Sequence, residues 1–284
     1  MSYLQILILA VIQGSCELLP VSSSAHVIAA EKLMGLDPSS PEMTMLLVML
    51  HTGTMFAVII YFWNGWKRDY LSSSSQIQWF AVLIVIATVC TGVIGYGLKI
   101  VIEKVFMRGV EHAEIENLFS NLPLIAGALT AVGLLIIYAG LKEEKTSRRS
   151  EIQPQHAVWI GLVQGLCLPF RGFSRSGSTI STGLILGLPK KKLEEFSFAL
   201  AVVLTPPIIA KEALRLVKSH ALSGQGSVTH LFVPGLIGMV LSFAAGLLAL
   251  KWLSRWLEGG RWKFFGFYCL VAAGGILLIH FKVK

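Results

Sequence analysis

Charged residues are scarce in this chain of 284 residues. Asp, Glu, Lys and Arg make up only 14% of it, and 54% of its residues are hydrophobic. Soluble domains carry roughly 25% charged residues, so the chain has too little polar surface for water and is predicted to be an integral membrane protein. Cysteines are also few. None of the four stands in a CxxC or Cys/His pattern, which favours packing residues over a zinc site or a disulfide framework.

Acidic residues are outnumbered by basic ones, 16 to 24, which leaves a net charge of +8. Such a balance can indicate nucleic-acid binding, but these basic residues flank apolar stretches and do not interleave with aromatic residues. The excess is better explained by the basic residues that cytoplasmic loops of membrane proteins carry and by their attraction to anionic lipid headgroups. We therefore expect contacts with membrane lipids and none with nucleic acid.

Long apolar stretches dominate the remaining sequence. Six of them, each of about 20 residues, are long enough to cross a bilayer as helices. They lie at 43–63, 79–98, 122–141, 193–214, 231–253 and 262–279. Four shorter apolar stretches predict re-entrant helices, which enter the bilayer and return. They lie at 3–12, 27–36, 157–168 and 180–188. The predicted fold class is an all-α integral membrane protein with about six transmembrane helices and two re-entrant helix-loop-helix elements.

A short polar motif occurs once in each half of the chain. The residues Gln13, Gly14, Cys16 and Ser23 align without a gap with Gln164, Gly165, Cys167 and Ser174. Each copy lies between two of the short stretches and is followed by three spans, and an odd number of spans inverts the second half relative to the first. We predict a single membrane domain, 1–284, with a first repeat at 1–141 and an inverted second repeat at 156–284.

Basic clusters predict the orientation of this domain. Four of them fall on one face by the count of spans, at 67–68, 142–149, 190–192 and 251–263. Cytoplasmic loops carry such an excess of Lys and Arg. Both termini and the entrance to the first motif are therefore expected on the outer face.

The first motif places a carboxylate in apolar sequence. Gln13 and Glu17 stand four residues apart, so a helix puts both on one face. A carboxylate inside a membrane segment costs about 3 kcal/mol on insertion scales, which makes Glu17 a candidate functional residue. The alternative is a structural hydrogen bond to a neighbouring helix. Glu17 and Gln13 are also candidate ligands of a divalent cation, Mg²⁺ or Ca²⁺, held weakly unless substrate oxygens complete the shell.

Three hydroxyls and an imidazole follow the break at Pro20. Ser22, Ser23 and Ser24 lie where the next helix should begin, and serine there commonly caps free backbone N–H groups. His26 lies three residues beyond Ser23, so on a helical turn its ring is within reach of a hydroxyl and can act as an acid or base. Ser22 and Ser24 are candidate substrate-binding groups. A structural histidine is the alternative interpretation.

The second motif, at 171–179, combines glycine, hydroxyl and guanidinium groups. Glycine lets the backbone approach a ligand closely, and free N–H groups at a helix start favour anions. Arg175 adds a planar fork that suits phosphate oxygens. A structural ion pair between Arg175 and Glu17 explains the charges but not the density of glycine and hydroxyl groups. The other candidate anion-binding residues are Arg171, Gly172, Ser174, Ser176, Gly177 and Thr179.

These motifs resemble those of the undecaprenyl-diphosphate phosphatases of the bacitracin-resistance type, and the likeness covers essentially the whole chain. The family hallmarks are Glu/Gln-x-x-x-Glu, found at 13–17, Leu-Pro-Val-Ser-Ser-x-x-His, found at 19–26, and Pro-Gly-x-Ser-Arg-Ser-Gly-x-Thr, found at 171–179. Two positions depart from the pattern. Gln13 stands where many members have Glu, and Arg171 stands where the motif usually has Pro.

The resemblance implies a bacterial inner-membrane enzyme that removes the terminal phosphate of undecaprenyl diphosphate and so recycles the lipid carrier for cell-wall synthesis. It also implies a site that opens to the outer, periplasmic side. By position, Ser23 would be the nucleophile, assisted by His26, and Ser174, Arg175 and Thr179 would hold the diphosphate. Direct attack by His26, through a phosphohistidine, is the other route.

A transporter or flippase of lipid phosphates is the alternative function, because inverted repeats with broken helices are also transporter architecture. The feature that distinguishes a phosphatase from a transporter is His26 beside the serine hydroxyls, because translocation needs an anion site but no nucleophile and base. A homodimer is compatible with the sequence.

Overall fold

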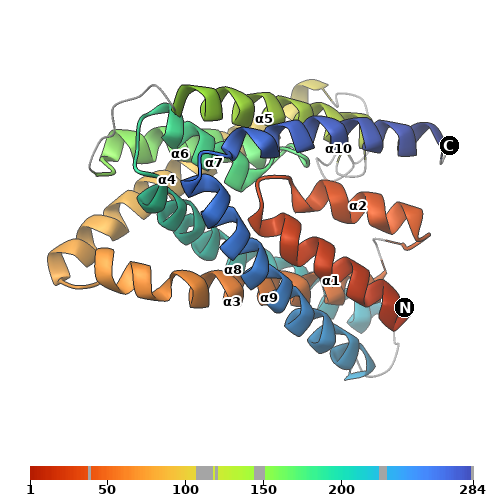
Figure 1. Cartoon of the computed structure of the whole chain (residues 1–284). Coiled ribbons are helices and arrows are strands. Elements are labelled where there is room, and N and C mark those ends of the chain that lie inside the picture. The colour runs from red at the N-terminus through yellow and green to blue at the C-terminus, as the bar shows by residue number, and fades with distance from the viewer. Residues whose placement is uncertain (38–39, 107–117, 119–120, 144–150, 224–228, 283–284) are drawn as a thin grey trace.

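The computed structural model describes the chain outside residues 38–39, 107–117, 119–120, 144–150, 224–228 and 283–284 (Figure 1). All regular elements in the described ranges are helices, which confirms the all-α prediction. The α-helices are α1 Tyr3–Leu18, α2 Ser23–Leu33, α3 Pro41–Asp69, α4 Ser74–Val101, α5 Leu122–Glu143, α6 Pro154–Cys167, α7 Arg175–Ile185, α8 Lys190–Ser223, α9 Thr229–Glu258 and α10 Trp262–Lys282. A π-helical turn, η1 Ile102–Phe106, continues α4.

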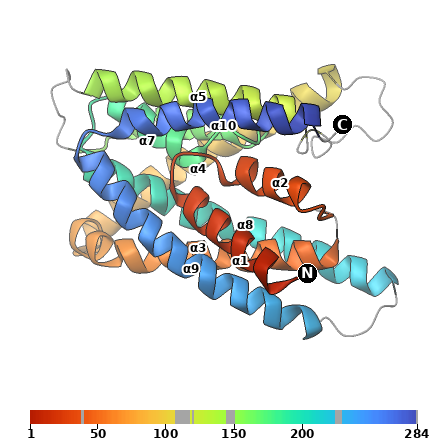
Figure 2. The same ribbon diagram turned by 45° about the vertical axis from the view of Figure 1, so that its right-hand side comes forward.

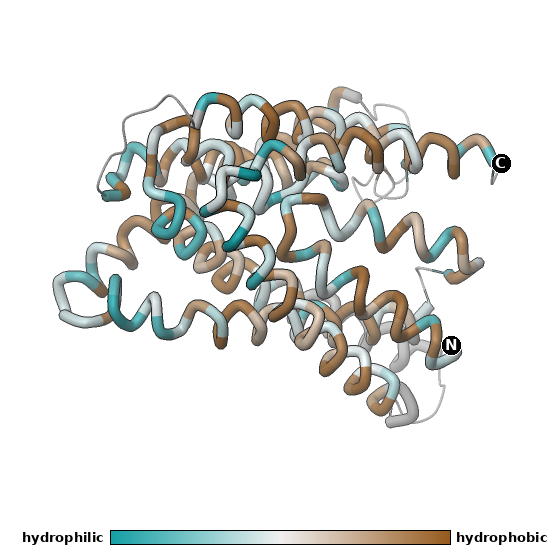
Figure 3. The backbone as a smooth tube through the Cα atoms, viewed as in Figure 1, coloured by the Kyte–Doolittle hydropathy of each residue, from teal (hydrophilic) through white to brown (hydrophobic). Residues whose placement is uncertain are grey.

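Among the described residues, five helices are long and apolar enough to cross a membrane. They are Met43–Asp69, Ser74–Val105, Leu122–Lys142, Phe232–Glu258 and Trp262–Lys282. These match five of the six predicted spans. The sixth, 193–214, lies within α8 but is not among the five, and part of it falls outside the residues whose side chains are described. In Figure 3 hydrophobic residues predominate along the helices, and hydrophilic residues gather at the turn between α3 and α4.

The short apolar stretches form two pairs of packed short helices, α1 with α2 and α6 with α7. The second helix of each pair ends earlier than the hydrophobic pattern predicts, because a glycine with positive φ follows it. Gly35 has a φ of 63° and Gly187 a φ of 78°. In each case the next residue donates its backbone N–H to a carbonyl one turn back, which satisfies the helix end.

The first helix of each pair packs against a long helix from the other half of the chain, α1 on α9 and α6 on α4, while α5 packs along α10 (Figure 2). The aligned glycines of the two motifs allow both approaches. A Cβ at Gly14 would lie 2.5 Å from the Ser242 carbonyl oxygen, and one at Gly165 would lie 2.6 Å from Cβ of Ile94. Any larger residue would force the paired helices apart.

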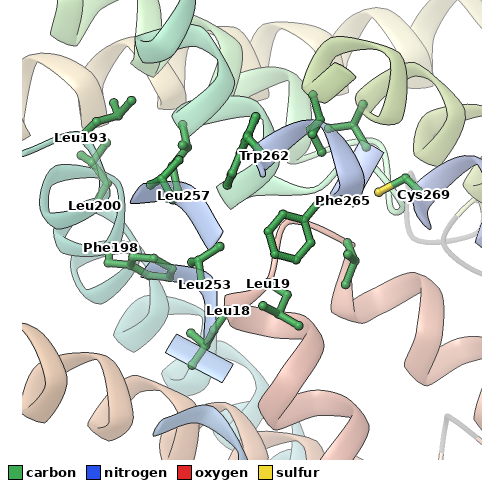
Figure 4. Close-up of a cluster of buried hydrophobic side chains, with 14 of the residues drawn as sticks. Leu18, Leu19, Leu193, Phe198, Leu200, Leu253, Leu257, Trp262, Phe265 and Cys269 are labelled. Carbon is green, nitrogen blue, oxygen red and sulfur yellow. The ribbon is translucent and has the colours of Figure 1, made fainter. Parts of the chain in front are cut away.

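The larger buried apolar cluster holds the first motif in place (Figure 4). Leu18 and Leu19, at the end of α1, are buried in this cluster together with Leu253 of α9 and with Trp262 and Phe265 of α10. The break between α1 and α2 is therefore fixed by packing on its apolar side, which leaves its polar residues to form a site.

Candidate active site

The break between α1 and α2 has an unusual backbone. Ser22, which precedes the first residue of α2, has φ 66° and ψ 97°, and it is the single described residue other than glycine with a positive φ. A non-glycine residue held in a rarely populated region costs about 1–3 kcal/mol, and such residues cluster at functional sites. In this conformation the carbonyl oxygen of Ser22 lies 2.8 Å from Nδ1 of His26.

The Glu17 carboxylate is the centre of the site. Its Oε2 accepts a hydrogen bond from Ser23 Oγ at 2.5 Å and another from Gln13 Nε2 at 3.1 Å. Its Oε1 accepts one from Arg175 Nη2 at 3.2 Å. The two motifs therefore meet, and the ion pair considered from the sequence is present in the structure.

Arg175 retains a donor that no described residue uses. Its Nη1 is buried and has no hydrogen-bond partner among the described side chains and backbone. A buried donor left unsatisfied costs free energy, and the cost is larger on a charged group. An anionic ligand placed beside Glu17 would remove that cost, so the guanidinium group is suited to bind one.

The start of α7 joins the second motif to the first. Ser174 caps the helix, since its Oγ accepts from the backbone N–H of Gly177 at 3.2 Å. Ser176 Oγ donates to the Leu19 carbonyl oxygen at 3.3 Å. Gly177 allows this contact, because a Cβ there would lie 3.2 Å from the Pro20 carbonyl oxygen. The N-terminus of α7, with its partial positive charge, thus lies against the break between α1 and α2.

Two further residues of the second motif have structural partners. Thr179 Oγ1 donates to the Arg175 carbonyl oxygen at 2.8 Å and lies 2.6 Å from Ser197 Oγ of α8. Gly172 has a φ of 102°, and a Cβ there would lie 2.4 Å from the carbonyl oxygen of Ile125. Backbone conformation and packing against α5 therefore require glycine at this position, whether or not a ligand is bound.

His26 contacts different groups from those expected. Its Nε2 lies 2.8 Å from the hydroxyl oxygen of Tyr268, and the two rings stack with centroids 5.6 Å apart. The expected hydrogen bond to a serine hydroxyl is absent among the described residues. Ser23 instead donates to Glu17, and the hydroxyls of Ser22 and Ser24 lie 3.2 Å from each other.

Arg171 of the second motif has an interaction with α2. It is exposed, and it interacts electrostatically with Glu31 of α2. Glu31 itself is buried, with an Oε1 that has no hydrogen-bond partner in the described part of the chain. The role of Arg171 in substrate binding stays a prediction.

Two residues of the site were missed from the sequence, His51 and Tyr268. Nε2 of His51 lies 3.9 Å from Glu17 Oε2, and its Nδ1 lies 2.8 Å from the Leu47 carbonyl oxygen. An ionisable side chain inside a predicted span was a signal that could have identified His51. Tyr268 offered no such signal, because tyrosine is ordinary in a membrane helix and 242 residues separate it from His26.

The candidate metal ligands do not form a cation site by themselves. The described ranges contain no group of three His, Cys, Asp or Glu side chains that could hold a metal ion. Glu17 already pairs with Arg175, and Gln13 turns its amide nitrogen toward the carboxylate. Glu17 and Gln13 fit Mg²⁺ or Ca²⁺ only together with the oxygens of a bound substrate.

The arrangement is suited to phosphoryl transfer. A hydroxyl hydrogen-bonded to a carboxylate can lose its proton to that carboxylate as it attacks, and an adjacent base is a common way to activate a serine nucleophile. Guanidinium and helix N-terminal N–H groups nearby can stabilise the negative charge of the transferred phosphoryl group.

Comparison with known proteins shows what the chain is similar to. The family described as bacitracin resistance protein BacA matches residues 6–275. A protein of Acinetobacter baylyi named undecaprenyl-diphosphatase 2 is 56% identical over 284 residues, which cover 98% of this chain and 98% of that protein. Proteins named undecaprenyl-diphosphatase from Halothermothrix orenii and Bacteroides thetaiotaomicron are 30% and 32% identical, over 98% of this chain and over 98% and 99% of their own lengths.

Proposed function

The chain belongs to the family of bacitracin resistance protein BacA, and we propose that it hydrolyses undecaprenyl diphosphate to undecaprenyl phosphate and inorganic phosphate. The observation that carries this function is the hydrogen bond of 2.5 Å from Ser23 Oγ to Glu17, beside the guanidinium group of Arg175. The substrate is inferred from the relatives named undecaprenyl-diphosphatase. The site offers a nucleophile, a base and a group that binds phosphate. The product is the lipid carrier used again in cell-wall synthesis.

In the first step, Ser23 Oγ attacks the terminal phosphorus while its proton passes to Glu17. The bond from that phosphorus to the bridging oxygen breaks, and undecaprenyl phosphate leaves. In the second step, water attacks the phosphoserine and loses its proton to His26. The bond between phosphorus and Oγ breaks, and Glu17 returns its proton to Ser23.

The second motif holds the diphosphate in this proposal. The unused Nη1 of Arg175 binds a phosphate oxygen, and the free N–H groups at the start of α7 bind another. Ser174 and Ser176 lie at this helix start, so both hydroxyls are within the same cradle. Glu17 is the partner of Arg175 when substrate is absent, which keeps the partly buried guanidinium group paired.

A divalent cation is proposed to bind with the substrate and not before it. Bound Mg²⁺ or Ca²⁺ would offset the charge of the diphosphate oxygens, which is the usual contribution of a metal to phosphoryl transfer. Glu17 and Gln13 are the side chains that would hold the cation. Weak binding follows, because the protein supplies one carboxylate and one amide.

The two halves are proposed to be inverted repeats, 1–141 and 156–284, in a bacterial inner membrane. The reciprocal packing of α1 on α9 and of α6 on α4 supports the repeat, as do the matching glycines after α2 and α7. Basic residues at 67–68, 190–192 and 251–263 support a cytoplasmic face there and a site that opens to the outside. Most of the basic cluster at 142–149 lies outside the described residues. A homodimer stays a prediction.

The test is phosphate release from undecaprenyl diphosphate by the purified protein in detergent. We expect turnover with Mg²⁺ or Ca²⁺, and little turnover in the Ser23→Ala variant. Ser75→Ala, an exposed serine at the start of α4, is the matched control and should keep full activity. Binding of the lipid without phosphate release, by well-folded wild-type protein, would favour a transporter of lipid phosphates.

A further inference from the structure

Tyr268 of α10 meets His26 of α2 through both its ring and its hydroxyl. The phenol oxygen lies 2.8 Å from Nε2 of His26, and the two rings are stacked at an interplanar angle of 12°. Tyr268 is about half exposed, unlike the buried Phe265 and Cys269 of the same helix. Its polar end therefore has a partner at the site, while its ring lies at the edge of the protein.

The contacts of His26 determine which ring nitrogen carries the proton. The Ser22 carbonyl oxygen can only accept a hydrogen bond, so Nδ1, at 2.8 Å from it, carries a proton and donates. In the neutral ring Nε2 then has a lone pair and accepts from the Tyr268 hydroxyl. Both nitrogens are thus engaged, and water cannot donate to Nε2 unless Tyr268 moves away.

This arrangement constrains any reaction in which His26 accepts a proton. A proton that reaches Nε2 must come from the Tyr268 hydroxyl, which can at the same moment accept a proton on its oxygen. The hydrogen bond between Nε2 and Tyr268 also opposes direct attack by His26 on phosphorus, because the lone pair that would attack is the one that accepts this hydrogen bond.

We propose that Tyr268 is a catalytic residue that relays the proton of the attacking water to His26. This inference rests on the phosphatase function proposed above. In the second step the water oxygen bonds to phosphorus, its proton passes to the phenol oxygen, and the phenolic proton passes to Nε2. The bond between phosphorus and Ser23 Oγ breaks, and Oγ takes the proton held by Glu17. Tyr268 ends neutral, and His26 ends as an imidazolium ion.

The kinetic test uses Tyr268→Phe, which keeps the stacked ring and removes the hydroxyl. Because the relay serves only the second step, release of undecaprenyl phosphate in the first turnover should keep its rate. Release of inorganic phosphate in later turnovers should fall by about tenfold or more, the effect of losing one well-placed hydrogen-bonding group. The variant should therefore show a burst of undecaprenyl phosphate, with kcat and KM lowered together and kcat/KM unchanged. Tyr138→Phe, at an exposed position of α5, is the control and should match the wild type.

The contact itself is tested without turnover, by the ¹⁵N signals of histidine side chains in labelled protein. The signal of His26 is identified by its loss in His26→Gln. We expect a protonated Nδ1 and an unprotonated, hydrogen-bonded Nε2 in the wild type. In Tyr268→Phe the Nε2 signal should move to that of a nitrogen without a hydrogen bond.

Three results would overturn the relay. The first is a Tyr268→Phe variant with wild-type phosphate release. The second is a variant in which the first-turnover release of undecaprenyl phosphate slows as much as the release of phosphate, because general damage to the site slows both steps. The third is an unchanged His26 signal. A wild-type protein that releases no phosphate contradicts the proposed function itself, and the His26 signal then tests the contact with Tyr268 on its own.

Discussion

Ser23 donates its hydroxyl hydrogen to Glu17 at 2.5 Å, across the break between α1 and α2. The serine belongs to α2 and the carboxylate to α1, so the contact exists only because the chain reverses between them. On the other oxygen, Glu17 accepts from Arg175 at the start of α7. One carboxylate therefore connects three helix ends, two from the first half of the chain and one from the second.

Glu17→Gln should nearly abolish turnover. The amide keeps the size of the side chain but cannot take the proton of Ser23, and loss of a general base lowers rates by roughly 10²–10⁴-fold. Phosphate release measured beside Glu151→Gln, an exposed glutamate that pairs with Lys192, checks this. Activity within a few-fold of wild type would remove Glu17 from the role of base.

Arg175→Ala should lose binding of the diphosphate as well as turnover, because it removes the guanidinium group that faces Glu17. Arg175→Lys should restore part of the binding but little of the rate, since an ammonium group keeps the charge and lacks the planar fork. Lipid binding and phosphate release, measured on both variants, separate the two effects. Equal activity of the lysine variant and the wild type would contradict recognition through the fork.

Gln13→Glu should strengthen activation by Mg²⁺ or Ca²⁺. A second carboxylate then lies one helical turn from Glu17 and offers the cation an additional charged ligand. The metal concentration that gives half-maximal phosphate release should fall, whereas Gln78→Glu, at an exposed position of α4, should leave it unchanged. Full activity of both wild type and Gln13→Glu in the presence of chelator would exclude the cation from the reaction.

Gly14→Ala should destabilise the fold. Its Cβ would lie 2.5 Å from the Ser242 carbonyl oxygen, so α1 and α9 must move apart, and overpacking of this kind costs about 1–3 kcal/mol. Gly92→Ala is the control, because a Cβ at that helical position meets nothing within 4 Å. Thermal unfolding in detergent should show a lower midpoint for the first variant and an equal or higher one for the second. Equal midpoints would show that the helices adjust without cost.

The sequence predicted the helical class, five of the long helices and both short-helix pairs, because these follow from the length and continuity of apolar stretches. It also brought Glu17 and Arg175 into consideration as partners, since a guanidinium group in apolar surroundings needs an anion. The ends of α2 and α7 were misplaced, because Gly35 and Gly187 stop each helix within an apolar stretch that continues.

The partners within the site could not be predicted in the same way. His26 was expected to bind a serine hydroxyl of its own turn, a local inference from spacing. The ring instead contacts Tyr268 of α10 and the carbonyl oxygen of Ser22, whose positive φ has no signature in the sequence. Contacts of this kind depend on how α10 packs beside α2, which periodicity does not encode.

The most direct measurement of the central claim is the position of phosphate on the enzyme during turnover. Wild-type protein is mixed with undecaprenyl diphosphate, quenched rapidly and digested, and the phosphorylated peptide is sequenced by mass spectrometry. The account predicts phosphate on Ser23, enriched when Tyr268 is replaced by Phe and absent from Ser23→Ala. Phosphate on His26, or normal turnover by Ser23→Ala, would contradict it.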